Sequence, residues 1–86
     1  MFFVGIDIAK NTHEATIIDD HGNTFVKPFK FKNSVVGFEK LLVSLNNLSP
    51  TVTDFEFGME ATGQYWLNLY TKLVESGYSV HVINPV

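Results

Sequence analysis

Two acidic residues stand where a carboxylate could do chemistry, and the first of them is Asp7. It lies in the stretch Val4-Gly5-Ile6-Asp7-Ile8-Ala9-Lys10, a predicted strand that is apolar or small on both faces and therefore typical of the centre of a sheet. An ionised carboxylate buried there is costly unless a cation, a metal or hydrogen-bond donors compensate it. Alternatively, Asp7 ends the strand and caps the turn at residues 10–12. This stretch alone supports both interpretations equally.

The second candidate is Glu60, which follows a predicted strand and precedes a glycine and a predicted helix. Sites of open α/β sheets gather outside the carboxyl ends of strands. If the strands of Asp7 and Glu60 are parallel neighbours, the two carboxylates meet at one edge, where they could hold Mg²⁺ or Mn²⁺. Taken alone, Glu60 is better explained as an acid stabilised by the dipole of the following helix.

Other residues add little to this pair. A two-metal site, with ions ~3.5–4 Å apart, normally draws on more than two carboxylates. Glu56 shares the strand parity of Glu60 and is the best third candidate, and the weaker ones are Asp19, Asp20 and Asp54. The three histidines have no ligand-like spacing, no serine adjoins a His–acid pair, and there is no Cys, P-loop, G-x-G-x-x-G or H-E-x-x-H motif.

The elements that must position the acids follow from the periodicity of the apolar residues. Alternation predicts strands from Phe2, over 12–19 and over 24–32, the third being an edge or bulged strand because of Pro28. Asn33-Ser34 predicts the start of a helix, and Asn46-Asn47 and Ser49-Pro50 predict its end. A fourth strand is predicted over 51–59 and a second helix from Gln64 to Gly77, with Thr62 as N-cap. A last strand over 78–83 is closed by Asn84-Pro85.

The order β-β-β-α-β-α-β predicts an α/β fold with a five-stranded mixed sheet. An antiparallel meander and two right-handed crossovers place the first strand in the middle and cover the sheet with helices. With 86 residues, 45% of them apolar, the chain has material for one small core. Neither a membrane span nor a signal peptide is predicted, so we expect a cytoplasmic protein.

The charge pattern argues against an autonomous nucleic-acid binder. The net charge is −3 and there is no arginine, the residue most used for phosphate and base contacts. Lys27, Lys30 and Lys32 do cluster on the third predicted strand. They either face a phosphate backbone or protect a sheet edge against pairing, and the second interpretation is favoured.

Three motifs together resemble a known family. They are G-I-D-I-A-K at 5–10, E-A-T-G-Q-Y at 60–65 and V-H-V-I-N-P at 80–85. Their types and spacing are similar to the amino-terminal part of the DEDD transposases of bacterial insertion-sequence family one hundred and ten, which are related to pilin-gene invertases (Piv/MooV). The resemblance covers essentially the whole chain. It implies an RNase H-like (RuvC-like) domain in which four acidic residues bind two divalent metal ions for DNA strand cleavage and transfer.

Within this resemblance, Asp7 matches the first acid and Glu60 the second, both as catalytic ligands of Mg²⁺ or Mn²⁺. The other two acids and a serine nucleophile match no residue of this chain. We therefore expect residues 1–86 to form one domain, the amino-terminal part of a longer protein, that is inactive alone. The resemblance also implies DNA as partner of the full-length protein, a structured guide RNA for some members, and a homo-oligomer.

Two other classes of protein stay open. One is the amino-terminal lobe of an actin-like kinase or ATPase, in which Asp7 would contact magnesium-phosphate. It is disfavoured because residues 10–13 contain no glycine of a phosphate-binding turn. The other is a non-catalytic RNase H-like module used for assembly.

Overall fold

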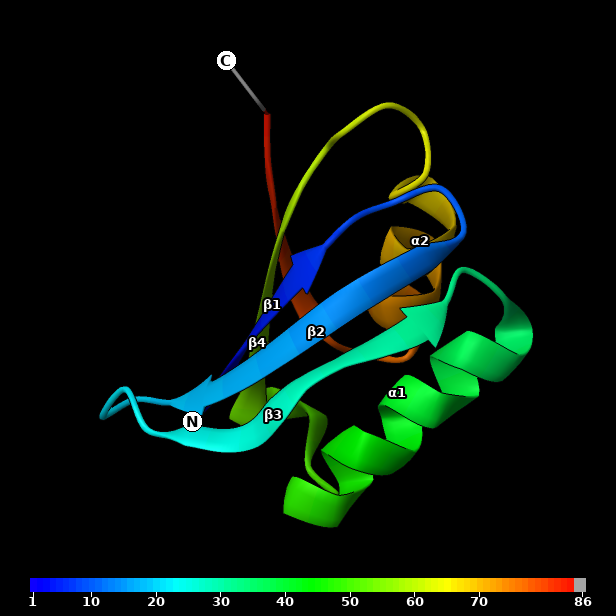
Figure 1. Ribbon diagram of the computed structural model, residues 1–86. Helices are drawn as coiled ribbons and strands as arrows, with labels where there is room; N and C mark the ends of the chain where they lie inside the picture. The colour runs from blue at the N-terminus through cyan, green and yellow to red at the C-terminus, as the bar shows by residue number, and fades with distance from the viewer. Residues whose placement is uncertain (85–86) are drawn as a thin grey trace.

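A five-stranded sheet forms the framework of the molecule (Figure 1). The computed structural model describes residues 1–84, apart from the side chain of Phe25. The strands are β1 (Phe2–Asp7), β2 (Thr12–Asp19), β3 (Thr24–Lys32), β4 (Phe55–Glu60) and β5 (Ser79–Ile83). Their order is β3-β2-β1-β4-β5; β1, β2 and β3 are antiparallel, and β4 and β5 run parallel to β1. The predicted α/β fold of RNase H-like topology, with the first strand in the middle, is confirmed.

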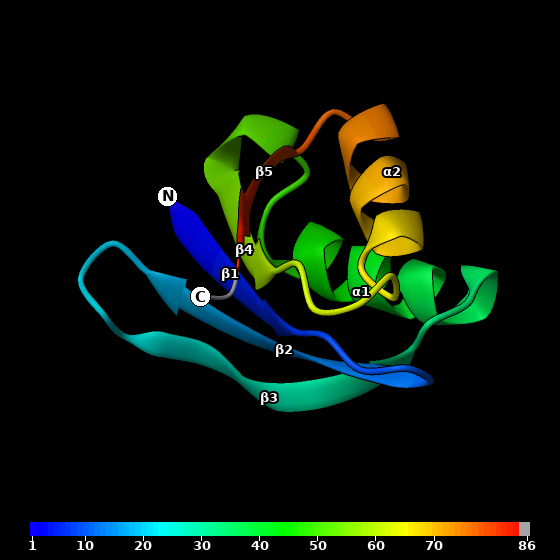
Figure 2. The same ribbon diagram turned by 90° about the horizontal axis from the view of Figure 1, so that it is seen from above.

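The two helices lie on the same face of this sheet (Figure 2). They are α1 (Val35–Leu48), which contacts β3, and α2 (Leu67–Glu75), which contacts β5. The side chains of β1 and β4 that point towards them are buried: Val4, Ile6, Phe55, Phe57 and Met59. With Leu41 and Leu45 of α1 and Leu69 and Leu73 of α2, they form the centre of the core.

The other face of the sheet is not covered by any element among residues 1–84. Phe3, Gly5 and Asp7 alternate to this face and are exposed. The expectation that β1 is buried on both faces, with Asp7 in an apolar environment, is therefore wrong. The apolar composition of β1 predicted its central place in the sheet, but it could not show that both helices pack on one side.

α1 begins at the predicted Ser34 cap and ends at Leu48, with Ser49 of the predicted Ser49-Pro50 stop as its C-cap. The Ser34 Oγ accepts a hydrogen bond from the Gly37 N–H at 3.1 Å, which is a typical N-cap. The helix runs through Asn46-Asn47 to Leu48, and the Ser49 N–H still donates to the Leu45 carbonyl at 3.0 Å. Gly37 is buried against β3, and a Cβ at this position would overlap the carbonyl oxygen of Lys32. The missing side chain lets the first turn of α1 approach the end of β3.

The start of α2 differs from the prediction because a turn intervenes. Gly63 has a φ of 58°, residues 63–66 form the turn, and the Trp66 Nε1–H donates to the Gly63 carbonyl at 3.2 Å. The helix therefore begins at Leu67 rather than Gln64, without Thr62 as its cap. Val74 lies outside the buried face of this helix and is 45% exposed.

Two strand boundaries also shift. Residues Val52–Asp54 form a 3₁₀ helix, so β4 begins at Phe55 rather than at residue 51. The hydroxyl of Ser49, which precedes this helix, donates a hydrogen bond to the Asp54 carboxylate at 2.6 Å. The Tyr78 N–H bonds to the Leu73 carbonyl at 3.0 Å, and β5 begins one residue later than predicted. Pro85, predicted to close that strand, lies outside the described residues.

β3 is the edge strand that Pro28 predicted. Its register with β2 shifts by one residue near Pro28: Ala15 pairs with Phe29, whereas Ile17 pairs with Val26. Among the described residues, no helix has the length and apolar character needed to cross a membrane.

Candidate functional site

Asp7 and Glu60 lie side by side at one edge of the sheet. Asp7 ends β1 and Glu60 ends β4, and these two strands are parallel neighbours. Ile6 pairs with Met59, so the two acids occupy the next position on each strand. Adjacent strands lie about 4.8 Å apart, and both side chains are exposed on the face that the helices do not cover. The structure thus brings the two predicted acids together.

Neither carboxylate serves the local structure. Within residues 1–84, the side chains of Asp7 and Glu60 form no hydrogen bond and no ion pair. Asp7 does not cap the turn that follows it. Glu60 precedes α2 by several residues, and the first turn of that helix has no acidic residue. The explanations of Asp7 as a turn cap and of Glu60 as a helix-dipole acid are therefore wrong.

An open hollow of about 430 Å³ connects the two acids. Gly5 and Gly58, which pair across the ladder, form part of its lining. A Cβ on either glycine would meet no atom within 4 Å, so the space above them is free. The hollow can therefore admit a bulky group close to the sheet backbone, next to both carboxylates.

Glu14 is a third acid beside this hollow that sequence reasoning missed. It pairs with Asp7 across the β1–β2 hairpin and also lines the hollow. The hairpin register could have identified it, because a strand partner of Asp7 points to the same face.

Glu56, the predicted third acid, lies elsewhere on the same face. It precedes Glu60 by four residues, about 13 Å along a strand, and with His81 it lines an adjoining hollow that does not include Asp7 or Glu60. The His81 Nε2 lies 2.8 Å from the Glu56 Oε2. Hydrogen bonds from Ser79 and then His81 lower the pKa of the Glu56 carboxyl. The alternation of side chains along the strand predicted correctly that Glu56 shares a face with Glu60. It did not show that the two residues are too far apart along the strand to lie in the same hollow.

The weaker metal-ligand candidates, Asp19, Asp20 and Asp54, all have local partners. Asp19 accepts hydrogen bonds from the N–H groups of His21 and Asn23 at 2.9 and 2.8 Å, and these bonds, Asn23 first, lower the pKa of its carboxyl. Asp20 lies 3.6 Å from the ring of His21, and Asp54 accepts from Ser49.

The donor set fits a hard divalent cation but is incomplete. Asp7 and Glu60 offer oxygen ligands of the type that Mg²⁺ and Mn²⁺ prefer. In the part of the chain that the structure describes, no group of three or more His, Cys, Asp or Glu side chains is arranged to hold a metal ion. The two acids would therefore supply only part of the ligands of such an ion.

Asn33 joins the two loops that follow the acids. Its Nδ2 lies 3.3 Å from the carbonyl oxygen of Lys10, in the loop after Asp7, and 3.4 Å from that of Tyr65, in the loop after Glu60. Its backbone N–H donates to the Asn11 carbonyl at 2.9 Å. No sequence signal indicates this role, because these contacts depend on how three distant segments pack.

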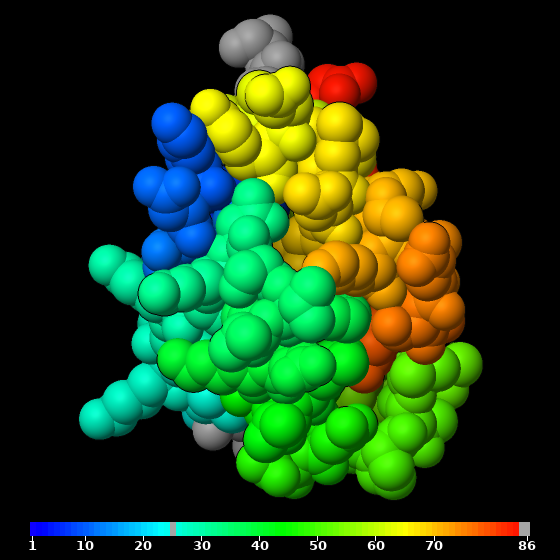
Figure 3. Space-filling model, turned by 90° about the vertical axis from the view of Figure 1, so that its right-hand side faces the viewer, coloured from blue at the N-terminus to red at the C-terminus, as the bar shows by residue number. Residues whose placement is uncertain are grey.

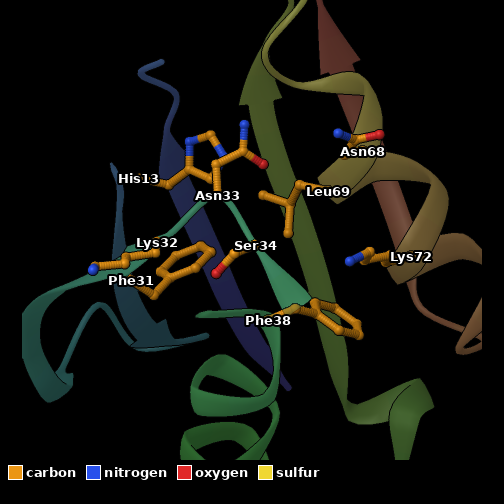
Figure 4. A pocket seen from close by; sticks show the side chains of 9 residues that line it. All are labelled: His13, Phe31, Lys32, Asn33, Ser34, Phe38, Asn68, Leu69 and Lys72. Atoms are coloured by element: carbon orange, nitrogen blue, oxygen red, sulfur yellow. The ribbon is translucent and has the colours of Figure 1, made fainter. Parts of the chain in front are cut away.

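His13 holds the first of these loops from inside the core. Its side chain is 1% exposed, and its Nδ1 accepts a hydrogen bond from the Ala9 N–H at 3.2 Å. The neutral ring therefore carries its proton on Nε2, which has no hydrogen-bond partner in the described structure. His13 borders a hollow of about 30 Å³ beside Asn33 and Leu69 (Figure 4), which has room for a water molecule.

Folding stability should fall at mildly acidic pH because of His13. Burial lowers the pKa of its ring below 6.5, and the neighbouring Asn33 side chain only partly offsets this. The unfolded chain then binds more protons, so the contribution of neutral His13 is complete above pH 6.5 and declines as the pH falls towards the folded-state pKa. Urea unfolding at several pH values measures this loss.

The control for this prediction is His13→Asn, which offers an oxygen in place of Nδ1 and does not titrate. We expect a flatter stability profile below pH 6.5 in this variant than in the parent chain. Equal profiles would show that His13 is not the group responsible.

Comparison with known proteins agrees with the motifs. A family model described as "Transposase", that of the DEDD transposases of IS110-type insertion sequences, matches residues 4–86. The pilin gene-inverting proteins of Moraxella lacunata and Moraxella bovis are each 32% identical to the chain over 84 residues. These matches cover 98% of this chain and 25% of each relative, so the chain spans about a quarter of their length.

Similar folds occur among solved structures of other proteins. A Ppx/GppA family member from Aquifex aeolicus has a TM-score of 0.46 at 15% identity, over 99% of this chain and 35% of that one. An exopolyphosphatase from Cytophaga hutchinsonii has a TM-score of 0.44 at 14% identity, over 98% and 34%. These values are too low to support a functional argument. The family match and the two relatives show that the chain belongs to the DEDD transposase family of IS110-type insertion sequences.

Proposed function

We propose that this chain supplies two metal ligands, Asp7 and Glu60, for divalent-metal-dependent DNA strand cleavage and transfer. One observation carries the proposal: two carboxylates without any local partner occupy adjacent positions on parallel strands, beside an open hollow. Exposed acids that serve neither a cap nor an ion pair are available to a ligand. Membership of a transposase family makes DNA the substrate that this ligand would act on.

The chain contributes ligands and their support. Bound Mg²⁺ or Mn²⁺ polarises a phosphoryl oxygen and stabilises the charge that develops on the attacking and leaving oxygens. Asp7 and Glu60 would hold the ion by their carboxylates, while His13 and Asn33 hold the loops behind them. Gly5 and Gly58 leave room for a DNA strand to approach. Further ligands would come from outside residues 1–86, and a guide RNA and self-association are further expectations from the family resemblance.

Metal removal tests this proposal at the level of activity. In the whole protein that the gene encodes, strand cleavage of a DNA carrying its recombination site should fall to background in a chelator. Added Mg²⁺ or Mn²⁺ should restore it, because the charge stabilisation comes from the ion. Cleavage that persists undiminished in the chelator would contradict a metal-dependent mechanism.

A further inference from the structure

Three lysine residues from two elements line one groove at the β3–α1 edge of the molecule. Lys30 and Lys32 come from the end of β3 and Lys40 from α1. The groove has a volume of about 360 Å³, and the remaining lining residues are Thr12, Phe31, Val36 and Gly37. Figure 3 shows α1 in green, with side chains of β3 projecting beside it. No carboxylate lines this groove, whereas the hollow at Asp7 and Glu60 has three.

The charges of these lysines are not neutralised locally. In residues 1–84 the ion-pair contacts to carboxylates are made by His21 and His81, and none by a lysine. Lys30 pairs with Glu14 in the ladder without forming an ion pair. The Lys40 Nζ donates to the carbonyl oxygen of Lys30 at 2.9 Å, which ties α1 to β3 but leaves its charge without a counterion.

Protection of the β3 edge accounts for Lys30 and Lys32 but not for Lys40. Edge protection needs charges on the strand itself, and Lys40 comes from a helix. The first turn of α1 contains no acidic residue, so the positive end of its dipole adds to the field of the groove. The chain as a whole carries a net charge of −3, and three of its six lysines line this one groove. This separation of charge points to an anionic partner.

We propose that the β3–α1 groove docks the phosphate backbone of double-stranded DNA. Each of the three lysines can neutralise a phosphate, and Val36, which is 74% exposed, offers an apolar contact to the sugars. DNA is the polyanion on which a transposase family acts. The choice of DNA as the polyanion rests on the proposed function. The rest of the inference does not depend on it.

The six lysines of the chain allow a matched test. The groove variant carries Lys30→Gln, Lys32→Gln and Lys40→Gln, and the control variant carries Lys10→Gln, Lys27→Gln and Lys72→Gln. Both change the net charge from −3 to −6. Binding of a fluorescent DNA duplex is measured by anisotropy over a range of salt concentrations, and circular dichroism verifies that each variant is folded.

We expect the groove variant to lose about tenfold or more in affinity, and the slope of log K against log salt to become shallower by about 2.7. The control variant should keep most of its affinity and the steeper slope. A third variant with arginine at the three groove positions should bind like the parent chain, which separates loss of charge from loss of packing.

Equal loss of binding in the groove and control variants would overturn the proposal, since it would show an effect of net charge alone. So would tighter, groove-dependent binding of an RNA duplex, which would assign the groove to RNA. Failure of this test leaves the metal test of Asp7 and Glu60 unaffected, because neither acid lines the groove.

Discussion

Asp7→Asn and Glu60→Gln should each reduce metal-dependent strand cleavage by about 10³-fold or more in the whole protein that the gene encodes. The expected magnitude follows from the several kcal/mol of charge stabilisation that a bound metal ion supplies. Each substitution replaces an anionic ligand by a neutral amide of the same shape. Quantified cleavage of a labelled DNA substrate, with and without added Mn²⁺, measures the effect.

The fold should tolerate both substitutions. Asp7 and Glu60 are exposed and form no hydrogen bond within the described residues, and surface changes of this kind usually alter stability by less than ~0.5 kcal/mol. The matched control is Glu56→Gln, on the same strand and face as Glu60 but in a different hollow. It should leave cleavage near the level of the unsubstituted protein. If Glu56→Gln reduced cleavage as much as Asp7→Asn does, the metal site would have to extend along β4 to Glu56, which would contradict the proposed pair.

Gly37→Ala should destabilise the chain by about 2–3 kcal/mol, although alanine is the better helix former. Propensity alone would favour alanine in α1 by up to ~1 kcal/mol. The new Cβ would overlap the Lys32 carbonyl oxygen, which belongs to the backbone and cannot rotate away. α1 would then have to move from β3, with loss of packing around Leu41. Urea unfolding gives the free energy directly.

Gly58→Ala is the matched control for this prediction. Gly58 lies in β4, and a Cβ there would meet no atom within 4 Å. Alanine at this position should therefore be neutral or slightly stabilising. If Gly37→Ala were as stable as the parent chain, the close approach of α1 to β3 would be wrong.

Much of the sheet could be predicted from the sequence because its signals are local. Alternation and turn residues give the five strands, and the Ser34 cap gives the start of α1. The adjacency of Asp7 and Glu60 followed from the right-handed connection that makes β1 and β4 parallel. Each of these inferences depends on residues close together in the chain or on a general rule of topology.

The remaining features depend on tertiary contacts that no local pattern reports. An apolar β1 has the same sequence whether one face or both are covered, so the exposure of Asp7 could not be predicted. Asn33 looked like a residue beside a helix cap, yet its amide reaches two loops 23 and 32 residues away. The contact of Lys40 with the Lys30 carbonyl likewise has no local signal, because it depends on how α1 packs against β3.

The most direct test of the central claim is the position of a Mn²⁺ ion on the ¹⁵N-labelled chain. Mn²⁺ broadens the NMR signals of nuclei near it. If Asp7 and Glu60 bind the ion together, the amide signals of residues 5–9 and 58–62 should broaden first, and Asp7→Asn combined with Glu60→Gln should abolish this effect. Broadening centred on Glu56 and His81, or unchanged by the double substitution, would contradict a metal site at the ends of β1 and β4.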